Sequence, residues 1–219
     1  MRKFFFIHIP KTAGTSFREA LERSISPDAL FCDYGPASKK TSLSVHDCIY
    51  GKDGFKVDEL TRQMEKFESS VLFGHIRAKK YIQNFGYEKM AVFLREPVAR
   101  AVSEYLHHKR HADFRGSLVD FCATGAGSNH QAKILQGVDI AKFGFVGITE
   151  YYERSLANFA LFSGVTVENI RLNVGSNYPD SFTLEELDCV RRANQLDMDL
   201  YHEALKVFEK QSGITVTVN

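Results

Sequence analysis

Residues 8–16, with the sequence HIPKTAGTS, combine features that bind phosphate. They follow an apolar run, and a tight turn at Gly14 would aim successive backbone N–H groups at one point, at the start of a helix. Lys11 adds a full positive charge, and the Thr15 and Ser16 hydroxyls add donors. The lysine precedes the glycine, so the segment lacks the Walker pattern, in which a Gly-Lys pair is followed by Ser or Thr. The alternative is an N-capped helix after a strand, with Lys11 in solvent.

Residues 93–103, with the sequence FLREPVARAVS, are suited to a second phosphate. Arg95 follows an apolar run, and ligands of open α/β sheets bind at the carboxyl ends of strands. Ser103 lies eight residues later, about two turns into a helix that would begin at Pro97. An arginine fork and a hydroxyl together suit a phosphate. The alternative is that Arg95 pairs with a surface carboxylate and Ser103 is an ordinary helix residue.

His75 lies at the predicted end of a strand, after the apolar run Ser70–Phe73 and Gly74. A histidine can act as a general base because its reference pKa of about 6.5 lies near working pH. The residue pattern alone favours a histidine that simply packs at the end of a strand.

The residues after His75 are rich in basic side chains and histidines. His107 and His111 in the segment HHKRH share a helix face, as metal ligands can. Lys109 and Arg110 would repel a cation, so we predict no metal. A rim that binds an acidic acceptor is better supported than a metal site, and a solvated helix face is the alternative. The predicted rim consists of Arg77, Lys79, Lys80, His107, His108, His111 and Arg115.

Three short apolar runs predict the buried strands that would position these segments: Phe4–Ile9, Ser70–Phe73 and Met90–Leu94. Apolar residues at helical spacing predict helices between and after them. These helices cover Ser16–Arg23, Val57–Phe67, a segment from Pro97, Thr149–Phe162, a segment after the capping box of Thr183 and Glu186, and Leu200–Phe208, ending near Gly213.

The alternation of strands and helices predicts one P-loop-like α/β domain over residues 1–219. Its three layers would be a mostly parallel sheet and the helices on its two sides. Residues 31–56 are rich in Gly, Pro, Ser, Asp and Lys without a sustained period, which predicts a long loop or lid.

The charges nearly cancel, since 28 Lys and Arg face 27 Asp and Glu and give a net charge of +1. Evenly spread, they would exclude a binder of nucleic acid or another polyanion. Residues 75–115, however, carry nine basic and four acidic side chains, a net charge of +5. Residues 150–219 carry six and eleven, a net charge of −5. The basic segment is therefore a candidate anion site, and no nucleic-acid partner is predicted.

The cysteines and the apolar runs bear on the cellular compartment. Cys32, Cys48, Cys122 and Cys189 are widely spaced and form no CxxC pair, which predicts reduced thiols and no zinc site. The apolar run near the N-terminus is too short for a signal peptide, and no segment approaches the roughly 20 apolar residues of a membrane span. We therefore expect a cytoplasmic protein without membrane contact.

Together the two phosphate segments resemble the paired phosphate motifs of the cytosolic and Golgi sulfotransferases, which use 3′-phosphoadenosine-5′-phosphosulfate (PAPS). IPKTAGTSF is similar to their 5′-phosphosulfate loop, and LREPVARAVSEY to their 3′-phosphate motif. The nearest pattern is that of the heparan and uronyl 2-O-sulfotransferases and their bacterial relatives. The similarity continues, in order, through residues 73–75, 129–137, 146–155, 172–174 and 194–201.

The resemblance implies roles for individual residues. The residues that would bind the 5′-phosphosulfate are Lys11, Thr12, Ala13, Gly14, Thr15 and Ser16. Those that would bind the 3′-phosphate are Arg95 and Ser103. Lys11 would also stabilise charge on the departing phosphate oxygen, and His75 would be the base. Gln131 and Lys133 match a stretch near the acceptor site, and we expect them, with Arg77, to contact a hydroxyl-bearing acceptor such as a carbohydrate. The product nucleotide would be 3′,5′-bisphosphoadenosine (PAP), and no metal is implied.

Two other functions fit parts of the sequence. A small kinase-like nucleotide-binding protein would need a Walker lysine and an acidic magnesium-binding motif, and neither is evident. A non-catalytic polyanion-binding module would use only the basic segment 75–115. The chain is shorter than the animal Golgi enzymes, without their anchor and stem. It also has no Trp, so we expect a Phe or Tyr to stack on adenine.

Overall fold

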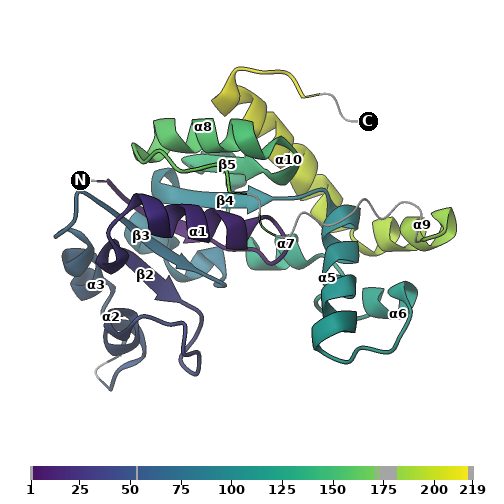
Figure 1. The fold of residues 1–219 in the computed structure, drawn as a ribbon, viewed down its shortest axis with the longest axis horizontal. Helices are drawn as coiled ribbons and strands as arrows, with labels where there is room; N and C mark the ends of the chain where they lie inside the picture. Colours follow the sequence, from purple (N-terminus) through teal and green to yellow (C-terminus); the bar gives the residue numbers. More distant parts are fainter. Residues whose placement is uncertain (1, 53, 171, 173–181, 217–219) are drawn as a thin grey trace.

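Five parallel strands form the central sheet of the computed structural model, which describes residues 2–52, 54–170, 172 and 182–216 (Figure 1). The strand order is β2-β3-β1-β4-β5. The strands are β1 (Arg2–Ile7), β2 (Leu30–Asp33), β3 (Ser69–Gly74), β4 (Met90–Leu94) and β5 (Phe145–Ile148). Because β1 pairs with both β3 and β4, the residues that follow these three strands lie at one edge of the sheet. The predicted α/β class with a parallel sheet is confirmed.

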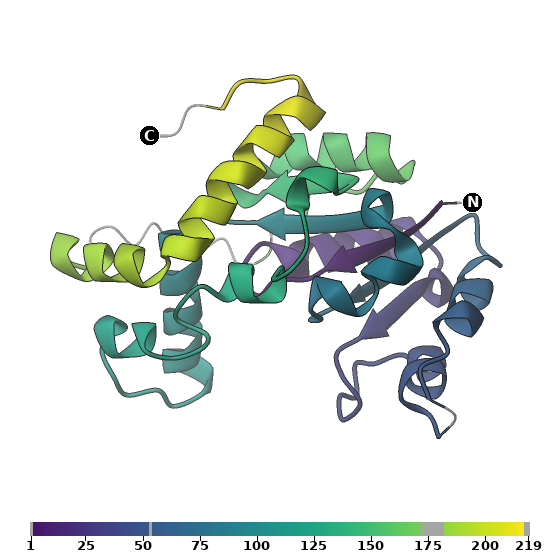
Figure 2. The ribbon, with the colours of Figure 1, turned by 180° about the vertical axis from the view of Figure 1, so that it is seen from behind.

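Helices cover both sides of the sheet (Figures 1 and 2). Successive side chains of a strand point to opposite faces, so Phe4 and Phe6 pack in a different cluster from Phe5 and Ile7. The first cluster includes residues of α1 (Gly14–Ser24) and α8 (Tyr152–Ser163). The second includes residues of α3 (Val57–Met64), α4 (Ile82–Phe85) and α10 (Gln195–Ser212). The result is the three-layer arrangement that the sequence predicts.

A separate apolar cluster joins three helices at the side of the molecule toward which β4 points. These are α5 (Pro97–His111), α6 (Leu118–Cys122) and α9 (Leu184–Ala193). Phe121 of α6 and Val190 of α9 are buried against Val102 and Tyr105 of α5. We call these three helices the side lobe. α7 (His130–Ile134) lies between it and the sheet (Figure 1).

The remaining elements are short. α2 spans Leu43–Val45 and continues as a π-helical turn over His46–Tyr50. Single 3₁₀ turns occur at Pro27–Ala29, Ala78–Lys80, Tyr87–Lys89, Ile140–Lys142 and Thr149–Tyr151.

Several boundaries confirm the sequence predictions. β4 has the predicted bounds, Pro97 is the first residue of α5, and the capping box of Thr183 and Glu186 begins α9. The four cysteines are free thiols, as predicted. No helix among the described residues has the length and apolar character needed to cross a membrane.

The prediction of a loop or lid over residues 31–56 was wrong at its start. Residues 31–33 belong to β2, which forms the edge of the sheet, and Leu43–Tyr50 is helical. The polar residues that dominate the segment begin only after Asp33, whereas Phe31 and Cys32 are buried. β5 was not predicted as a strand, because a four-residue run with a central Gly147 gives little periodicity.

Candidate active site

The turn between β1 and α1 has a strained backbone. Lys11 and Ala13 have φ of 70° and 65°, in the left-handed region that non-glycine residues rarely adopt. The Thr12 side chain is buried and donates a hydrogen bond from Oγ1 to the Ile9 carbonyl, over 2.9 Å, which fixes the turn from inside. Such strain persists only where the surrounding structure holds it, and it concentrates at binding sites.

Gly14 is required for a reason that differs from the predicted one. It does not have a positive φ; instead, a Cβ at this position would lie 1.8 Å from Nε2 of His8. The glycine therefore lets the start of α1 approach the His8 ring. Thr15 is exposed, whereas the buried Ser16 hydroxyl accepts from the Leu172 N–H over 2.9 Å and is 3.2 Å from its carbonyl oxygen. Of the two predicted donor hydroxyls, Ser16 thus has a partner within the chain.

The second predicted phosphate segment lies beside this turn. Arg95 follows β4, is half-buried, and donates from Nη1 to the Lys11 carbonyl over 3.2 Å. Ser103 is half-buried in α5. The carboxylate of Glu96 caps the first turn of α5 by accepting from the N–H groups of Val98 and Ala99. The Arg95 side chain thus bonds to the backbone of the first segment, so the two predicted phosphate segments lie next to each other.

Lys11 lies in a site with several other charges. Burial lowers its pKa, and nearby Arg110 and Arg95 act in the same direction, while Glu104 opposes them. Burial and Lys11 also lower the pKa of His107 in α5. The turn between β1 and α1, which we call the phosphate turn after its predicted ligand, therefore faces α5, and this proximity concentrates positive charge between them.

His75 follows β3 and is exposed at the same edge. Its Nε2 lies 2.8 Å from Nδ1 of His8, and the Tyr34 ring packs edge-on against it with centroids 4.9 Å apart. Burial of the ring by its neighbours and the positive charge of Lys40 lower the pKa of His75 to about 4. His75 is therefore neutral at pH 7, so one of its ring nitrogens carries a hydrogen and the other a lone pair.

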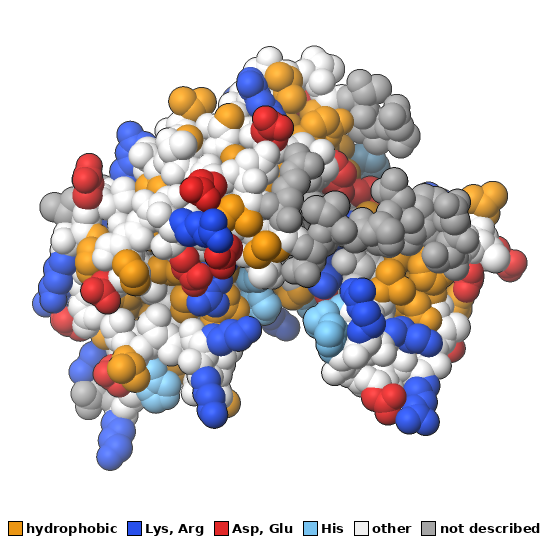
Figure 3. Space-filling model, viewed as in Figure 1, with side chains coloured by type: hydrophobic (Ala, Val, Ile, Leu, Met, Phe, Trp, Pro, Cys, Tyr) orange, Lys and Arg blue, Asp and Glu red, His pale blue; other side chains and the backbone are white. Residues whose placement is uncertain are grey.

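Figure 3 shows a hollow between the part of the molecule that carries β2 and α2 and the side lobe. Histidine, Lys and Arg side chains gather on both of its walls. The turn after β1, Arg95 after β4 and His75 after β3 lie at the carboxyl ends of neighbouring parallel strands, where open α/β sheets bind ligands.

Comparison with known proteins identifies the family. The profile of the sulfotransferase family matches residues 1–160. The chain belongs to the sulfotransferase family. Among solved structures, it is similar to a sulfotransferase from Alicyclobacillus acidocaldarius, with 16% identity, a TM-score of 0.46, and coverage of 99% of this chain and 98% of that one. The comparison with curated protein sequences gives no match.

In this sulfotransferase, Gln131 supports Arg95 rather than facing the hollow. Its amide accepts from the Arg95 N–H over 3.1 Å and donates to the Arg95 carbonyl over 2.9 Å, and the residue has no exposed surface. Asp197 of α10 in turn accepts from the N–H groups of Gln131 and Ala132. This burial does not fit the predicted contact with an acceptor and gives Gln131 a positioning part. Lys133 is exposed, with Nζ 2.7 Å from the Ser128 carbonyl.

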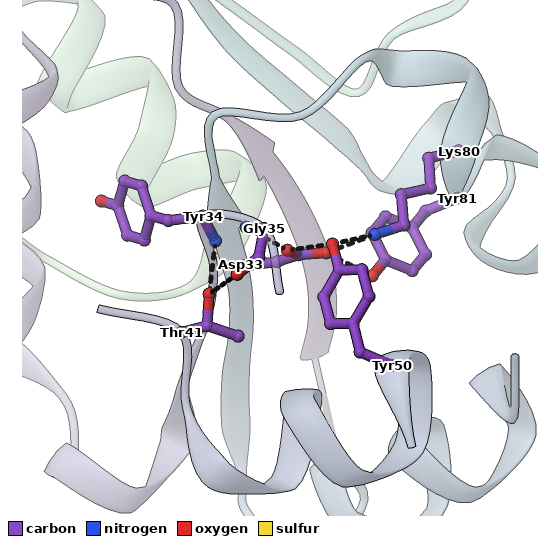
Figure 4. Close-up of polar contacts among 7 residues, drawn as sticks. All are labelled: Asp33, Tyr34, Gly35, Thr41, Tyr50, Lys80 and Tyr81. Atoms are coloured by element: carbon purple, nitrogen blue, oxygen red, sulfur yellow. Dashed lines mark hydrogen bonds and ion pairs between the residues drawn. The ribbon is translucent and has the colours of Figure 1, made fainter. Parts of the chain in front are cut away.

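A second buried network fixes the end of β2 beside His75 (Figure 4). Asp33 is fully buried, and each of its carboxylate oxygens accepts two hydrogen bonds. Oδ1 accepts from Tyr50 Oη over 2.7 Å and from the Gly35 N–H over 3.0 Å. Oδ2 accepts from Lys80 Nζ over 2.7 Å and from Tyr81 Oη over 2.6 Å. Burial alone would raise the pKa of Asp33, but these donors, Lys80 foremost, hold it below its usual value.

The same network orders the turn that carries Tyr34. Thr41 Oγ1 accepts from the Tyr34 N–H over 3.0 Å and donates to the Gly35 carbonyl over 2.7 Å. Figure 4 shows the Tyr34 ring pointing away from Asp33, and it is this ring that packs against His75. No local pattern in the sequence indicates the network, because its members come from four separate segments.

The predicted basic rim is therefore only partly free to bind an acceptor. Lys80 is engaged by Asp33, so its assignment to the rim was wrong, and Arg115 forms an exposed ion pair with Asp113. Arg77 and Lys79 are exposed. The ring centroids of His107 and His111 lie 4.7 Å apart. The described residues contain no group of three His, Cys, Asp or Glu side chains placed to hold a metal.

We expect Asp33→Asn to lower the free energy of unfolding at pH 7 by roughly 3–5 kcal/mol, because it leaves Lys80 largely buried without its counter-charge. Asp28→Asn, at an exposed site, should change it by less than about 0.5 kcal/mol. Since the folded-state pKa of Asp33 is depressed, its contribution is complete above the unfolded pKa of about 3.9 and is lost as pH falls further. Urea unfolding at several pH values measures this, and a difference independent of pH would contradict it.

We expect Gln131→Ala to weaken the binding of PAP about tenfold, because two hydrogen bonds that hold the Arg95 backbone are lost. Gln136→Ala, an exposed glutamine just after α7, serves as the matched control and should leave the affinity unchanged. Isothermal titration of PAP into the two variants makes the comparison. Equal affinities would show that Arg95 does not depend on Gln131.

Proposed function

We propose that the protein transfers a sulfuryl group from PAPS to a hydroxyl of a carbohydrate acceptor, with His75 as the base. The observation that carries the proposal is the 3.2 Å hydrogen bond from Arg95 to the Lys11 carbonyl, which joins two phosphate-binding segments at the edge where His75 lies. Family membership supports sulfuryl transfer in general. The donor, the acceptor and the base are the finer parts of the proposal.

The chain's own residues fit a nucleotide donor that carries phosphate groups at two separate positions of its ribose, 3′ and 5′. Lys11 and the backbone of residues 11–14 would hold the 5′-phosphosulfate, with the Thr15 hydroxyl beside them. Arg95 and Ser103 would hold the 3′-phosphate. Two cationic side chains that follow the neighbouring strands β1 and β4 match PAPS better than ADP or ATP, whose phosphates form a single chain. The close approach of Gly14 to His8 leaves this turn no room for a side chain at its centre.

The reaction is an in-line displacement. The acceptor oxygen forms a bond to sulfur while the bond between sulfur and the 5′-phosphate oxygen breaks. The acceptor's proton passes to His75, which is neutral at pH 7 because its pKa is lowered to about 4. Negative charge gathers on the departing phosphate oxygen, where the Lys11 ammonium and the N–H groups of the turn stabilise it.

Exposed cations at the rim support an acidic carbohydrate as the acceptor. Arg77 and Lys79 follow His75 and are exposed, and Lys133 of α7 is exposed as well. Their charges would attract carboxylate or sulfate groups of a sugar chain. A panel of acceptors with labelled PAPS tests this part, and transfer to phenols alone would contradict a carbohydrate acceptor.

We expect PAP to raise the melting temperature much more than ADP with magnesium does, because only PAP fills both phosphate positions. Arg95→Ala should weaken PAP binding about 10- to 100-fold, as expected for a charged hydrogen-bond partner, while Arg192→Ala at an exposed position should not. Thermal shift assays measure both effects. Equal or reversed stabilisation would favour a kinase-like protein, and salt-sensitive heparin binding without turnover would favour a polyanion-binding module.

We expect His75→Ala to lower the turnover rate about 10²- to 10⁴-fold with PAP binding retained, because the acceptor's proton loses its base. His202→Ala, an exposed histidine of α10, is the matched control. Transfer of labelled sulfate under saturating PAPS gives the rates. Unchanged turnover in His75→Ala would remove His75 from this role without affecting the donor assignment.

A further inference from the structure

His8 occupies the junction between the phosphate turn and the candidate base. Its N–H donates to the Gly74 carbonyl over 2.8 Å, which extends the pairing of β1 and β3 by one residue and sets His8 beside His75. The residue is only 8% exposed. Its position in the first phosphate segment gave no indication of a partner, because His75 lies 67 residues away.

The His8 ring is held on three sides. Nδ1 lies 2.8 Å from Nε2 of His75, with the two rings at 70° and their centroids 4.2 Å apart. The Phe73 ring packs at 5.1 Å, and the backbone of Gly14 leaves no space for a Cβ against the far side of the ring. The ring therefore has little freedom to turn, and its Nδ1 stays directed at His75.

A single hydrogen lies between the two nitrogens when both rings are neutral. If His8 donates, the lone pair of His75 Nε2 is consumed and its Nδ1 carries the other hydrogen, so His75 has no nitrogen free to accept a proton. If His75 donates from Nε2, its Nδ1 keeps a lone pair. Only the second tautomer makes His75 a base.

We propose that His8 is a positioning residue for His75: its neutral Nδ1 accepts the hydrogen bond from His75 Nε2 and thereby leaves His75 Nδ1 to take the proton of the acceptor hydroxyl. The inference rests on the proposed role of His75 as base. When Nδ1 takes that proton, the Nε2–H of the resulting imidazolium still donates to His8, which stabilises the charged ring.

The surroundings favour a neutral partner over a carboxylate. Burial lowers the pKa of His8 well below its usual value, and His75, Arg18 and Lys40 act in the same direction, so His8 stays uncharged. A carboxylate here would place negative charge beside the phosphosulfate that the turn is proposed to bind. A histidine orients the base without that repulsion. His8 and Tyr34 contact His75, and the charged or titratable groups that act on it from neighbouring elements are Arg18, Lys40, Glu104 and His130.

Two substitutions separate orientation from packing. His8→Leu removes the acceptor, and we expect turnover to fall about 10- to 100-fold with PAP affinity retained. His8→Asn keeps an oxygen near the position of Nδ1, because both atoms are bonded to Cγ, and it should retain most of the turnover. Equal turnover in His8→Leu and the wild type, or equal losses in both variants, would overturn the inference.

The tautomer of His75 gives a second readout that does not depend on activity. Two-bond ¹⁵N–¹H correlation spectra of the wild-type protein, with His75→Gln to assign the signals, should show His75 protonated at Nε2. Protonation at Nδ1 would overturn the inference even if the His8→Leu protein were too unstable to assay. An inactive His75→Ala variant together with a fully active His8→Leu variant would support His75 as the base and contradict the positioning role of His8. A fully active His75→Ala variant would contradict both roles.

Discussion

The hydrogen bond from the Arg95 guanidinium to the Lys11 carbonyl is the contact around which the site is arranged. It requires that β1 and β4 be parallel neighbours, since only then do the residues after them meet at one edge. The carbonyl that accepts this bond belongs to Lys11, one of the two residues of the turn with a positive φ. The strained turn and the arginine thus hold one another.

Arg95 in turn depends on segments far from it in the chain. The Gln131 amide pairs with the Arg95 backbone, and Asp197 holds the first turn of α7 that carries Gln131. Asn194 reinforces this junction by accepting from the Asn129 N–H over 2.8 Å. The family-like segments 129–137 and 194–201 are therefore joined in space, and together they fix the backbone of Arg95.

The sequence predicted the elements whose signals are local. A continuous apolar run marks β4, Pro97 marks the start of α5, and both phosphate segments occur where strands end. It failed where the deciding contact is distant: β2 is stabilised by pairing with β3, and Lys80 is held by Asp33, which lies 47 residues earlier. The tight turn predicted at Gly14 has its positive φ angles at Lys11 and Ala13 instead; Gly14 begins α1, and its small size is required by the His8 ring, through packing that no local pattern reports.

The net charge of +1 does not show that the acidic segment 150–219 supports the backbone around Arg95. Glu150 accepts from the N–H of Glu96, the residue after Arg95, and from Tyr201 Oη, while Asp197 reaches Arg95 through Gln131. Burial raises the pKa of both carboxyls, while N–H and O–H donors and nearby cations, Arg95 for Glu150 and Arg100 for Asp197, oppose this rise. Two residues of the −5 segment thus support the backbone at Arg95 and Glu96: Glu150 accepts from the Glu96 N–H, and Asp197 holds Gln131, which pairs with the Arg95 backbone. The charge at the site therefore depends on which side chains the fold brings to it, and not on the net charge of the sequence.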